Sequence, residues 1–239
     1  MTTRFAVDES VFERFPGYRR GIVVARGVVN LTADPELEAR LTAAEGLVVM
    51  RFADADWRAD PRLAVWLEAF GRLGVGVGSK PPSVAALVKR VAKGASLPFI
   101  NRLVALMNVT SLENLVPCGG DDLGTVGKEL VLRPAVGTED YRPLGRPEVL
   151  EHPDPGELIL VDTATSIVLC RCWCWRNSDM TKLTEETTAV ALNLDLMSPA
   201  VSVEEGIAVT RRLADDMHRC CGGDVAWRIL DKDRPESRF

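Results

Sequence analysis

Short apolar runs separated by turn-forming residues fill the second half of this sequence. Four runs of strand length lie at 128–134, 157–162, 166–176 and 187–197. The segments between them, such as RPLGRPEV and EHPDPGE, are rich in glycine, proline and charge, a composition that favours turns. This half therefore predicts a β-sheet layer.

Helical periodicity dominates most of the rest of the chain. Apolar spacing predicts helices over 61–73, around 83–93, after Pro98, and over 203–221, where Ser202 and Glu205 form a capping box. The β-branched runs at 21–29 and 46–52 flank a further helix at 35–44, which predicts a strand, helix, strand opening. We expect one mixed α/β (α+β) domain over 1–239 with a sandwich-like β layer and helices outside, a core at about 15–221, and a flexible tail from about 231.

The charge of the chain is unevenly distributed. The net charge is −5, yet residues 69–112 contain no Asp or Glu. The basic residues in this window are Arg72, Lys80, Lys89, Arg90, Lys93 and Arg102. These basic residues can attract a polyanion locally even though the chain as a whole carries a negative net charge. Lys89, Arg90 and Lys93 fall on one side of a helix that Ser83 can cap, and this side is either a binding surface or an ordinary solvated helix face.

Two further groups of residues can form a polar site. Asn101 and Asn108 lie seven apart at the edge of a helical stripe that includes Ile100, so they share one side and can orient a ligand or cap loops. In CGGDD, Gly119 and Gly120 allow close approach to backbone N–H groups, and Asp121 and Asp122 follow. A solvated Gly-Gly turn is the alternative for this string.

The run SIVLCRCWCWR reads as a strand in which Arg171, Trp173 and Trp175 share one face, with Arg176 next. Aromatic planes beside arginine suit a terminal unpaired adenosine. A core strand with one snorkelling arginine fits equally well.

The six cysteines indicate buried thiols rather than disulfides or a metal site. Cys170, Cys172 and Cys174 alternate, and same-face strand neighbours are about 6.6 Å apart, too far for shared zinc. No nucleotide-binding, nucleophile-elbow or zinc-protease motif occurs. We therefore expect no cofactor and no metal. Absence of a signal-peptide run or an apolar stretch of about 18 residues predicts a cytoplasmic protein without a membrane partner.

The order of Asn101, Asn108, Pro117 and the acidic loop resembles the tRNA-editing (B-three/B-four) domain of the phenylalanyl-tRNA synthetase beta subunit, which also occurs free-standing. The segments ELVLRPAVGTEDYRPLG, PGELILVD and CRCWCWRNS extend the resemblance over roughly Phe15 to Cys221. It implies a protein that binds the aminoacylated 3′ end of tRNA, rather than DNA, and hydrolyses wrongly attached amino acids.

The family places a histidine where this chain has Gly119, so the resemblance leaves water activation to other residues. As catalytic groups we expect Asp121 or Asp122 to order the water and the N–H groups of Gly119 and Gly120 to bind the oxyanion. The substrate-binding candidates are Asn101, Asn108, Arg171, Trp173, Trp175 and Arg176. The tRNA-binding candidates are Lys80, Lys89, Arg90, Lys93 and Arg102.

Two other classes of function remain open at this point. A non-catalytic module could bind tRNA or a free amino acid through the same pocket, which the missing histidine favours. The other class is a small protein that binds a metal through thiols, and only the cysteines support this hypothesis. The sequence specifies neither the target amino acid nor the oligomeric state.

Overall fold

The computed structural model describes residues 2–239. The helices are α1 (Glu9–Arg14), α2 (Pro35–Arg51), α3 (Pro61–Arg72), α4 (Ser83–Ala92), α5 (Arg102–Asn114) and α6 (Val203–Cys221), with a 3-10 turn at Trp57–Ala59. The strands are β1 (Arg4–Val7), β2 (Tyr18–Arg26), β3 (Cys118–Asp122), β4 (Glu129–Pro134), β5 (Leu158–Asp162), β6 (Ile167–Arg171), β7 (Arg176–Asn177), β8 (Ala189–Met197), β9 (Asp224–Leu230) and β10 (Glu236–Arg238). The expected mixed α+β fold is confirmed.

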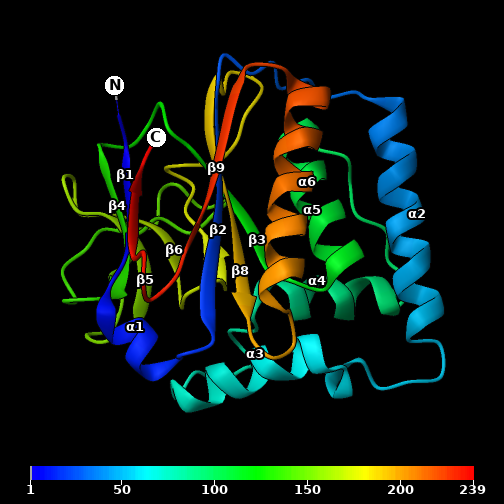
Figure 1. Ribbon diagram of the computed structural model, residues 1–239, viewed down its shortest axis with the longest axis horizontal. Helices are drawn as coiled ribbons and strands as arrows, with labels where there is room; N and C mark the ends of the chain where they lie inside the picture. The colour runs from blue at the N-terminus through cyan, green and yellow to red at the C-terminus, as the bar shows by residue number, and fades with distance from the viewer. Residues whose placement is uncertain (1) are drawn as a thin grey trace.

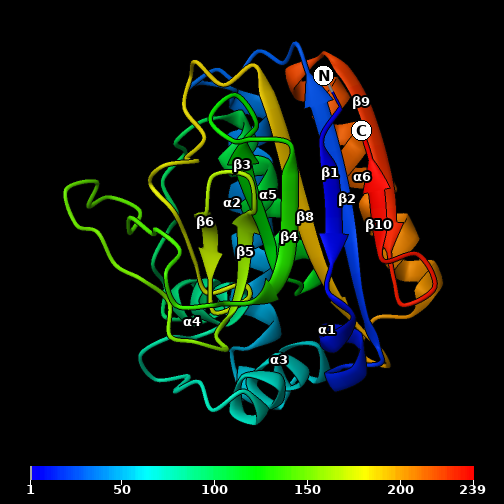
Figure 2. The same ribbon diagram turned by 90° about the vertical axis from the view of Figure 1, so that its left-hand side faces the viewer.

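Two sheets and a layer of helices make up the molecule. One sheet has six strands in the order β10-β1-β4-β5-β6-β7, and the other has four in the order β3-β8-β2-β9. Figure 1 shows the six-stranded sheet on the left, the four-stranded sheet in the middle, and α2, α5 and α6 on the right. Turned by 90°, the six-stranded sheet lies in front of the helices (Figure 2).

The main core fills the space between the layers, because apolar residues from both sheets and from the helices form one continuous cluster. Trp173, which follows β6, contacts the ring of Tyr18 on β2 at 4.9 Å and that of Trp66 on α3 at 5.2 Å. All three side chains are almost fully buried. This aromatic cluster joins the two sheets at one end of the sandwich.

Helix α6 lies close to β2 because both elements carry small residues at their contact. A Cβ added at Gly21 would come within 2.4 Å of Thr210 Oγ1, and one at Gly206 within 3.0 Å of Arg19. The capping box of Ser202 and Glu205 is present as expected. On α6, Thr210 is buried at this contact, whereas Val203 and Ile207 are exposed.

Several expectations about individual elements are wrong. Residues 46–52 do not form a strand: α2 continues to Arg51, since Val48 completes its buried stripe. Strand β6 ends at Arg171, and Cys172 and Trp173 adopt positive φ, so the predicted alternation of the later residues is broken. Ser83 does not cap α4, which begins after Pro82 without a side-chain cap.

The C-terminal segment, where we expected a flexible tail, contains a paired strand. Strand β10 pairs with β1 in antiparallel fashion, and the ring of Phe239 contacts that of Phe5 at 5.3 Å. Ile100, expected in a buried stripe, is 53% exposed because α5 begins only at Arg102. Within residues 2–239, no helix has the length and apolar character needed to cross a membrane.

Candidate functional site: a polar pocket between the sheets

A pocket of about 240 Å³ opens between the two sheets next to the start of α4. The four-stranded sheet contributes polar side chains from β2, β3 and β8, and the six-stranded sheet and the turn after it contribute apolar groups and thiols. The lining residues are Arg20, Ser83, Met107, Pro117, Cys118, Gly119, Asp121, Leu144, Leu160, Cys170, Trp173, Cys174, Trp175, Arg176, Asn177, Asn193 and Asp195.

A buried ion pair forms the inner end of this pocket. Arg20 on β2 lies opposite Asp195 on β8 in the strand register, and Arg20 Nη1 donates to Asp195 Oδ1 at 2.9 Å. Tyr18 OH donates to the same carboxylate oxygen. Burial raises the pKa of Asp195, against the effects of Arg20 and Tyr18. Because the charges are paired, this end can accept a zwitterionic or neutral group.

One polar atom at the pocket has no protein partner. Asn193 Oδ1 is buried and makes no hydrogen bond. Asn193 is 4% exposed and lines the pocket. Trp173 Nε1 is also buried, but it lies beside the Asp195 carboxylate and lowers the pKa of that group, so it belongs to the inner polar cluster. Leaving a buried polar atom unpaired costs about 1–3 kcal/mol, so the unpaired Asn193 acceptor indicates a site for a polar ligand.

The Asp121 carboxylate lies at the pocket wall, and its pKa is raised. It is 2% exposed and accepts a hydrogen bond from Thr181 Oγ1 at 2.7 Å. Burial raises the pKa of Asp121 to about 6 and Asp122 adds to the shift, while the Thr181 hydrogen bond and the charge of Arg20 oppose it. A carboxylate with this pKa is largely ionised at neutral pH yet basic enough to accept a proton.

The two glycines of CGGDD play different parts. In the β3–β8 ladder, Asp195 N donates to Pro117 O and Leu123 N donates to Ala189 O. Alternation along an antiparallel pair then turns the Gly119 N–H toward β8 and the Gly120 N–H away from it. A Cβ at Gly119 would meet only Asn177, at 3.7 Å, whereas one at Gly120 would come within 2.4 Å of Leu192. Gly119 thus leaves space in the pocket, and Gly120 allows close packing.

Trp175, which lines the pocket, lies beside a basic group that does not line it. Lys80 Nζ lies 5.4 Å from the centre of the Trp175 ring and 3.7 Å from Glu157. Arg176 also lines the pocket, and its guanidinium donates to Leu144 O at 2.9 Å. The planar Trp175 ring beside the Lys80 cation is suited to a nucleobase next to phosphate.

Several predicted site residues lie outside this pocket. Asn101 caps α5, accepting from Val104 N at 3.0 Å and donating to Leu183 O at 3.2 Å. Asp122 accepts from Thr187 Oγ1 at 2.6 Å and Gly124 N at 2.7 Å, which fixes the turn after β3. Asn108, on α5, is half-buried and does not line the pocket.

Arg171 is held in an ion-pair cluster instead of facing a substrate. Its guanidinium binds Glu157 through two hydrogen bonds of 2.8 and 2.6 Å and Glu151 through one of 2.9 Å. It also stacks on Tyr141 at 5.5 Å rather than on the tryptophans. The ligand role expected for Arg171 therefore has no geometric support.

Residues 69–112 contain no Asp or Glu, but in the fold acidic residues from other segments lie next to two of their basic side chains. Glu157 lies next to Lys80, and Asp34 forms an ion pair with Arg102 at 2.9 Å. Lys89, Arg90 and Lys93 are exposed as expected. The basic surface is therefore concentrated on the C-terminal half of α4.

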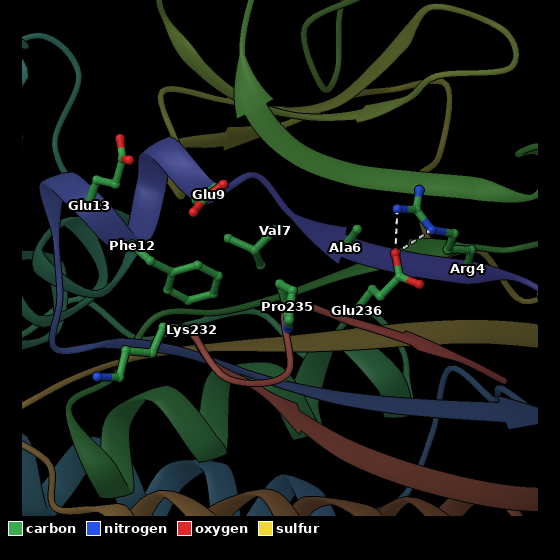
Figure 3. Close-up of a pocket in the computed structure, with 9 residues that line it drawn as sticks. All are labelled: Arg4, Ala6, Val7, Glu9, Phe12, Glu13, Lys232, Pro235 and Glu236. Carbon is green, nitrogen blue, oxygen red and sulfur yellow. Dashed lines mark hydrogen bonds and ion pairs between the residues drawn. The ribbon is translucent and has the colours of Figure 1, made fainter.

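A larger cavity of about 480 Å³ lies elsewhere, between β1, α1 and the β9–β10 turn. Figure 3 shows Glu9, Glu13 and Lys232 around it, with Arg4 bound to Glu236. None of the predicted site residues lines this cavity, and the unpaired Asn193 Oδ1 does not lie there. We therefore place the candidate site in the smaller pocket, which is built around buried polar groups.

The cysteines contribute buried thiols to the pocket. Burial raises the pKa of Cys118, Cys170 and Cys174, all of which line it. These thiols are consequently protonated at neutral pH and poor nucleophiles. In the part of the chain that the structure describes, no cluster of three His, Cys, Asp or Glu side chains is arranged to hold a metal ion.

Sequence reasoning missed Arg20, Asn193 and Asp195. A signal was present, since Asn193 and Asp195 interrupt the apolar run ALNLDLM at alternate positions and Arg20 stands in YRRGIVVAR. Charged or amide groups on one face of an otherwise buried strand indicate a polar site.

This arrangement defines a small-ligand pocket between two sheets with a basic helix beside it. A family model described as B3/4 domain matches residues 65–209 of the chain. The match spans more than half of the 239 residues, and the chain belongs to the B3/4 domain family. The resemblance found in the sequence is thereby confirmed for this range.

Among solved structures, the chain is similar to an N-terminal fragment of the phenylalanyl-tRNA synthetase beta-subunit from Pyrococcus horikoshii, at 14% identity and a TM-score of 0.44. The alignment covers 92% of this chain and 49% of the fragment, so the chain spans about half the length of that relative. No curated protein sequence matches the chain.

Proposed function

We propose that this protein binds the aminoacylated 3′ end of tRNA and hydrolyses the ester of a wrongly attached amino acid in trans. The observation that carries the proposal is Asp121, a buried carboxylate with a pKa raised to about 6 at the wall of a ligand-sized pocket. A general base for ester hydrolysis must be ionised at the working pH and within hydrogen-bond reach of the attacking water.

The pocket's polar groups suit an aminoacyl ester. Asn193 Oδ1 provides an unpaired acceptor for a donor of the ligand. The Arg20–Asp195 pair adds a neutral, strongly polar surface for an α-amino group or carbonyl. Met107, Leu160 and the thiols contact the less polar parts of the aminoacyl group.

Helix α4 links this pocket to a phosphate-binding surface. Ser83, its first residue, lines the pocket, and its N–H donates to Cys174 O at 2.8 Å. At about 1.5 Å per residue, Lys89 and Lys93 lie roughly 9 and 15 Å further along the helix. A tRNA acceptor end placed in the pocket therefore has its next phosphates within reach of these cations.

In the proposed reaction, Asp121 takes a proton from water as the water oxygen attacks the ester carbon. The tetrahedral intermediate collapses as the bond to the ribose oxygen breaks, and that oxygen takes the proton back from Asp121, directly or through the neighbouring ribose hydroxyl. The products are the free amino acid and uncharged tRNA. The Gly119 N–H points toward β8 and Gly120 does not line the pocket, so the candidate donor to the oxyanion is the Asn177 amide, which also donates to Gly120 O at 3.0 Å.

A panel of correctly and wrongly charged tRNAs tests the proposal. The protein at catalytic concentration should release the amino acid from at least one mischarged species and leave correctly charged tRNA intact. Asp121→Asn should abolish release without loss of tRNA binding. The hydrolase proposal fails if every ester persists at high protein concentration.

A non-catalytic binding module is the second candidate. It is favoured by Gly119, where the pocket is open at the position at which the family has a histidine. Persistence of every ester together with salt-sensitive tRNA binding would support this module instead.

A further inference from the structure

Strand β9 forms one edge of the four-stranded sheet, and its outer side has no neighbouring strand. In the order β3-β8-β2-β9, it pairs with β2 alone. Its other main contacts are with α6, which packs on one face of the sheet, and with β10 after the connecting turn. Figure 2 shows β9 and β10 at the right-hand margin of the two sheets. An open edge of 7 residues can pair with a further strand.

The register determines which backbone groups of β9 face outward. Gly27 N donates to Thr188 O in continuation of the β2–β8 ladder, so odd-numbered residues of β2 bind β8 and even-numbered residues bind β9. The β2–β9 register pairs even-numbered residues with each other. The N–H and C=O groups that point away from the sheet therefore belong to Val225, Trp227 and Ile229. Within residues 2–239, the Trp227 C=O accepts from the Arg228 side chain at 2.8 Å, and the other outward groups have no partner.

The charged side chains of β9 are spaced symmetrically about Ala226. Asp224 lies two residues before Ala226 and Arg228 two residues after it, so all three side chains point to the same face of the strand. All three residues are exposed. Within the described residues neither charge forms an ion pair, and Arg26, which lies opposite Asp224 on β2, donates to Thr3 at 3.4 Å instead. The edge therefore presents one unpaired charge of each sign.

We propose that this edge is a dimer interface, in which β9 pairs antiparallel with β9 of a second copy of the chain around a twofold axis at Ala226. Asp224 then lies directly opposite the partner's Arg228, and Arg228 lies opposite the partner's Asp224. The two alanines face each other at a non-hydrogen-bonded position, where the Cα atoms are about 4.5 Å apart and small side chains fit. The two four-stranded sheets become one continuous sheet.

The outward backbone groups also match in this register. Val225 and the partner's Trp227 form a hydrogen-bonded pair, in which the N–H of each donates to the C=O of the other. A β-branched residue opposite an aromatic one is a favourable cross-strand pair. Both side chains are only partly buried, on the α6 side of the sheet, where Arg211 stacks on the Trp227 ring at 5.5 Å. Pairing therefore satisfies open backbone groups and buries apolar surface that the monomer exposes.

The sequence of β9 selects a second copy of the same strand as the partner. Opposite charges at equal distances from one residue make an antiparallel strand complementary to itself, as a twofold interface requires. An in-register parallel copy would place like charges side by side. A shift of two residues, the smallest that keeps the hydrogen-bonding pattern, would place Asp224 opposite Ala226 or Leu230 and lose both charge pairs. Residues 224–230 do not line the pocket between the sheets, so the inference is independent of the proposed function.

Sedimentation equilibrium of the full chain from about 1 to about 300 μM tests the interface. The wild type should shift from monomer to dimer. Val225→Pro should remain monomeric, because proline lacks the outward N–H while the neighbouring residues keep their bonds to β2. A monomeric wild type, or a dimer that survives Val225→Pro, overturns the proposal. Circular dichroism confirms that each variant is folded.

A charge swap tests the register. Arg228→Asp alone faces the partner's Asp224 with a like charge and should weaken the dimer about tenfold or more. Adding Asp224→Arg restores opposite charges at both positions and should recover dimerisation. The matched control, Lys128→Asp, makes the same charge change at an exposed position on another segment and should dimerise like the wild type. A double variant as weak as Arg228→Asp, or an equal loss in the control, contradicts the charge pairing.

Cysteine cross-linking locates the twofold axis. Ala226→Cys should form a disulfide between the two copies under mild oxidation, because Cα atoms about 4.5 Å apart are within the range that a disulfide spans. Asp224→Cys should not, since its two copies lie about 13 Å apart along the paired strands. The wild type, with its 6 native cysteines, provides the background. Cross-linking of Asp224→Cys, or none of Ala226→Cys above the background, contradicts the proposed axis.

Discussion

At the scale of single residues, Asp121 should make the proposed deacylation rate depend on pH. Its pKa, raised by burial to about 6, lies well above the ordinary value of 3.8. As a general base it must be ionised, so the deacylation rate should rise with pH with a midpoint near 6. Asp121→Asn should remove this pH dependence along with most of the activity, measured as single-turnover rates between pH 5 and 8.

Stability provides the matching control for Asp121. The folded chain binds the Asp121 proton more tightly than the unfolded chain does. Its contribution to the free energy of unfolding is therefore fully present below about pH 3.8 and is lost as pH rises through about 6. Asp121→Asn should be as stable as the wild type or more stable at neutral pH. A large loss of stability would instead assign Asp121 a structural role.

The two neighbouring glycines give a matched pair of variants. Gly120→Ala should lower the free energy of unfolding by about 1–3 kcal/mol, because its Cβ would approach Leu192 and Met107 within 2.4 and 2.7 Å. Gly119→Ala meets only Asn177, at 3.7 Å, and should change stability little while it narrows the pocket. Urea denaturation measures both effects. Equal losses of stability would contradict the assignment of Gly119 to the pocket and Gly120 to the core.

Asp121 was predicted from the sequence because a carboxylate after two glycines is a local pattern. The Arg20–Asp195 pair was not, since the two residues are 175 positions apart and meet only through the β2–β8 register. Arg171 was misassigned for the same reason: its partners Glu151 and Glu157 lie outside the run that was analysed. Local spacing identifies candidate residues, whereas long-range pairing decides which of their side chains remain available to a ligand.

At the scale of elements, α4 carries the proposed contact with the tRNA backbone. Replacing Lys89, Arg90 and Lys93 together by Ala should weaken tRNA binding and reduce the slope of log affinity against log salt by about 2 to 3. The matched control replaces Arg58, Lys128 and Lys232, which are exposed on other elements. Filter binding at several salt concentrations measures both variants. An equal loss in the control would mean that α4 has no special role.

The elements themselves were predictable where pattern and packing agree. Strands β4, β5 and β8 appear where the apolar runs placed them, and the Ser202 cap starts α6 as expected. The run at 46–52 was misread because its apolar residues are continuous, so no period separates strand from helix. In the fold, Val48 of that run turns inward, Leu47, Val49 and Met50 are exposed on α2, and Phe52 follows the helix and packs partly against the core.

At the scale of the whole molecule, the two sheets create the site by facing each other. The four-stranded sheet supplies Arg20, Asp121 and Asn193, and the segment that follows β6 in the other sheet supplies Trp173 and Trp175. The fold class followed from the sequence, yet the pocket did not. It depends on which faces of two non-adjacent sheets meet, and a single sequence contains no direct signal for that.

The most direct test of the central claim is a crystal structure of the protein with a non-hydrolysable aminoacyl-adenosine amide. We expect the aminoacyl group between the two sheets, within hydrogen-bond distance of Asn193 and close to Asp121, with the adenine against Trp175. Binding of the analogue in the cavity beside β1 and α1, or only along the surface of α4, would contradict the assignment of the pocket as the functional site.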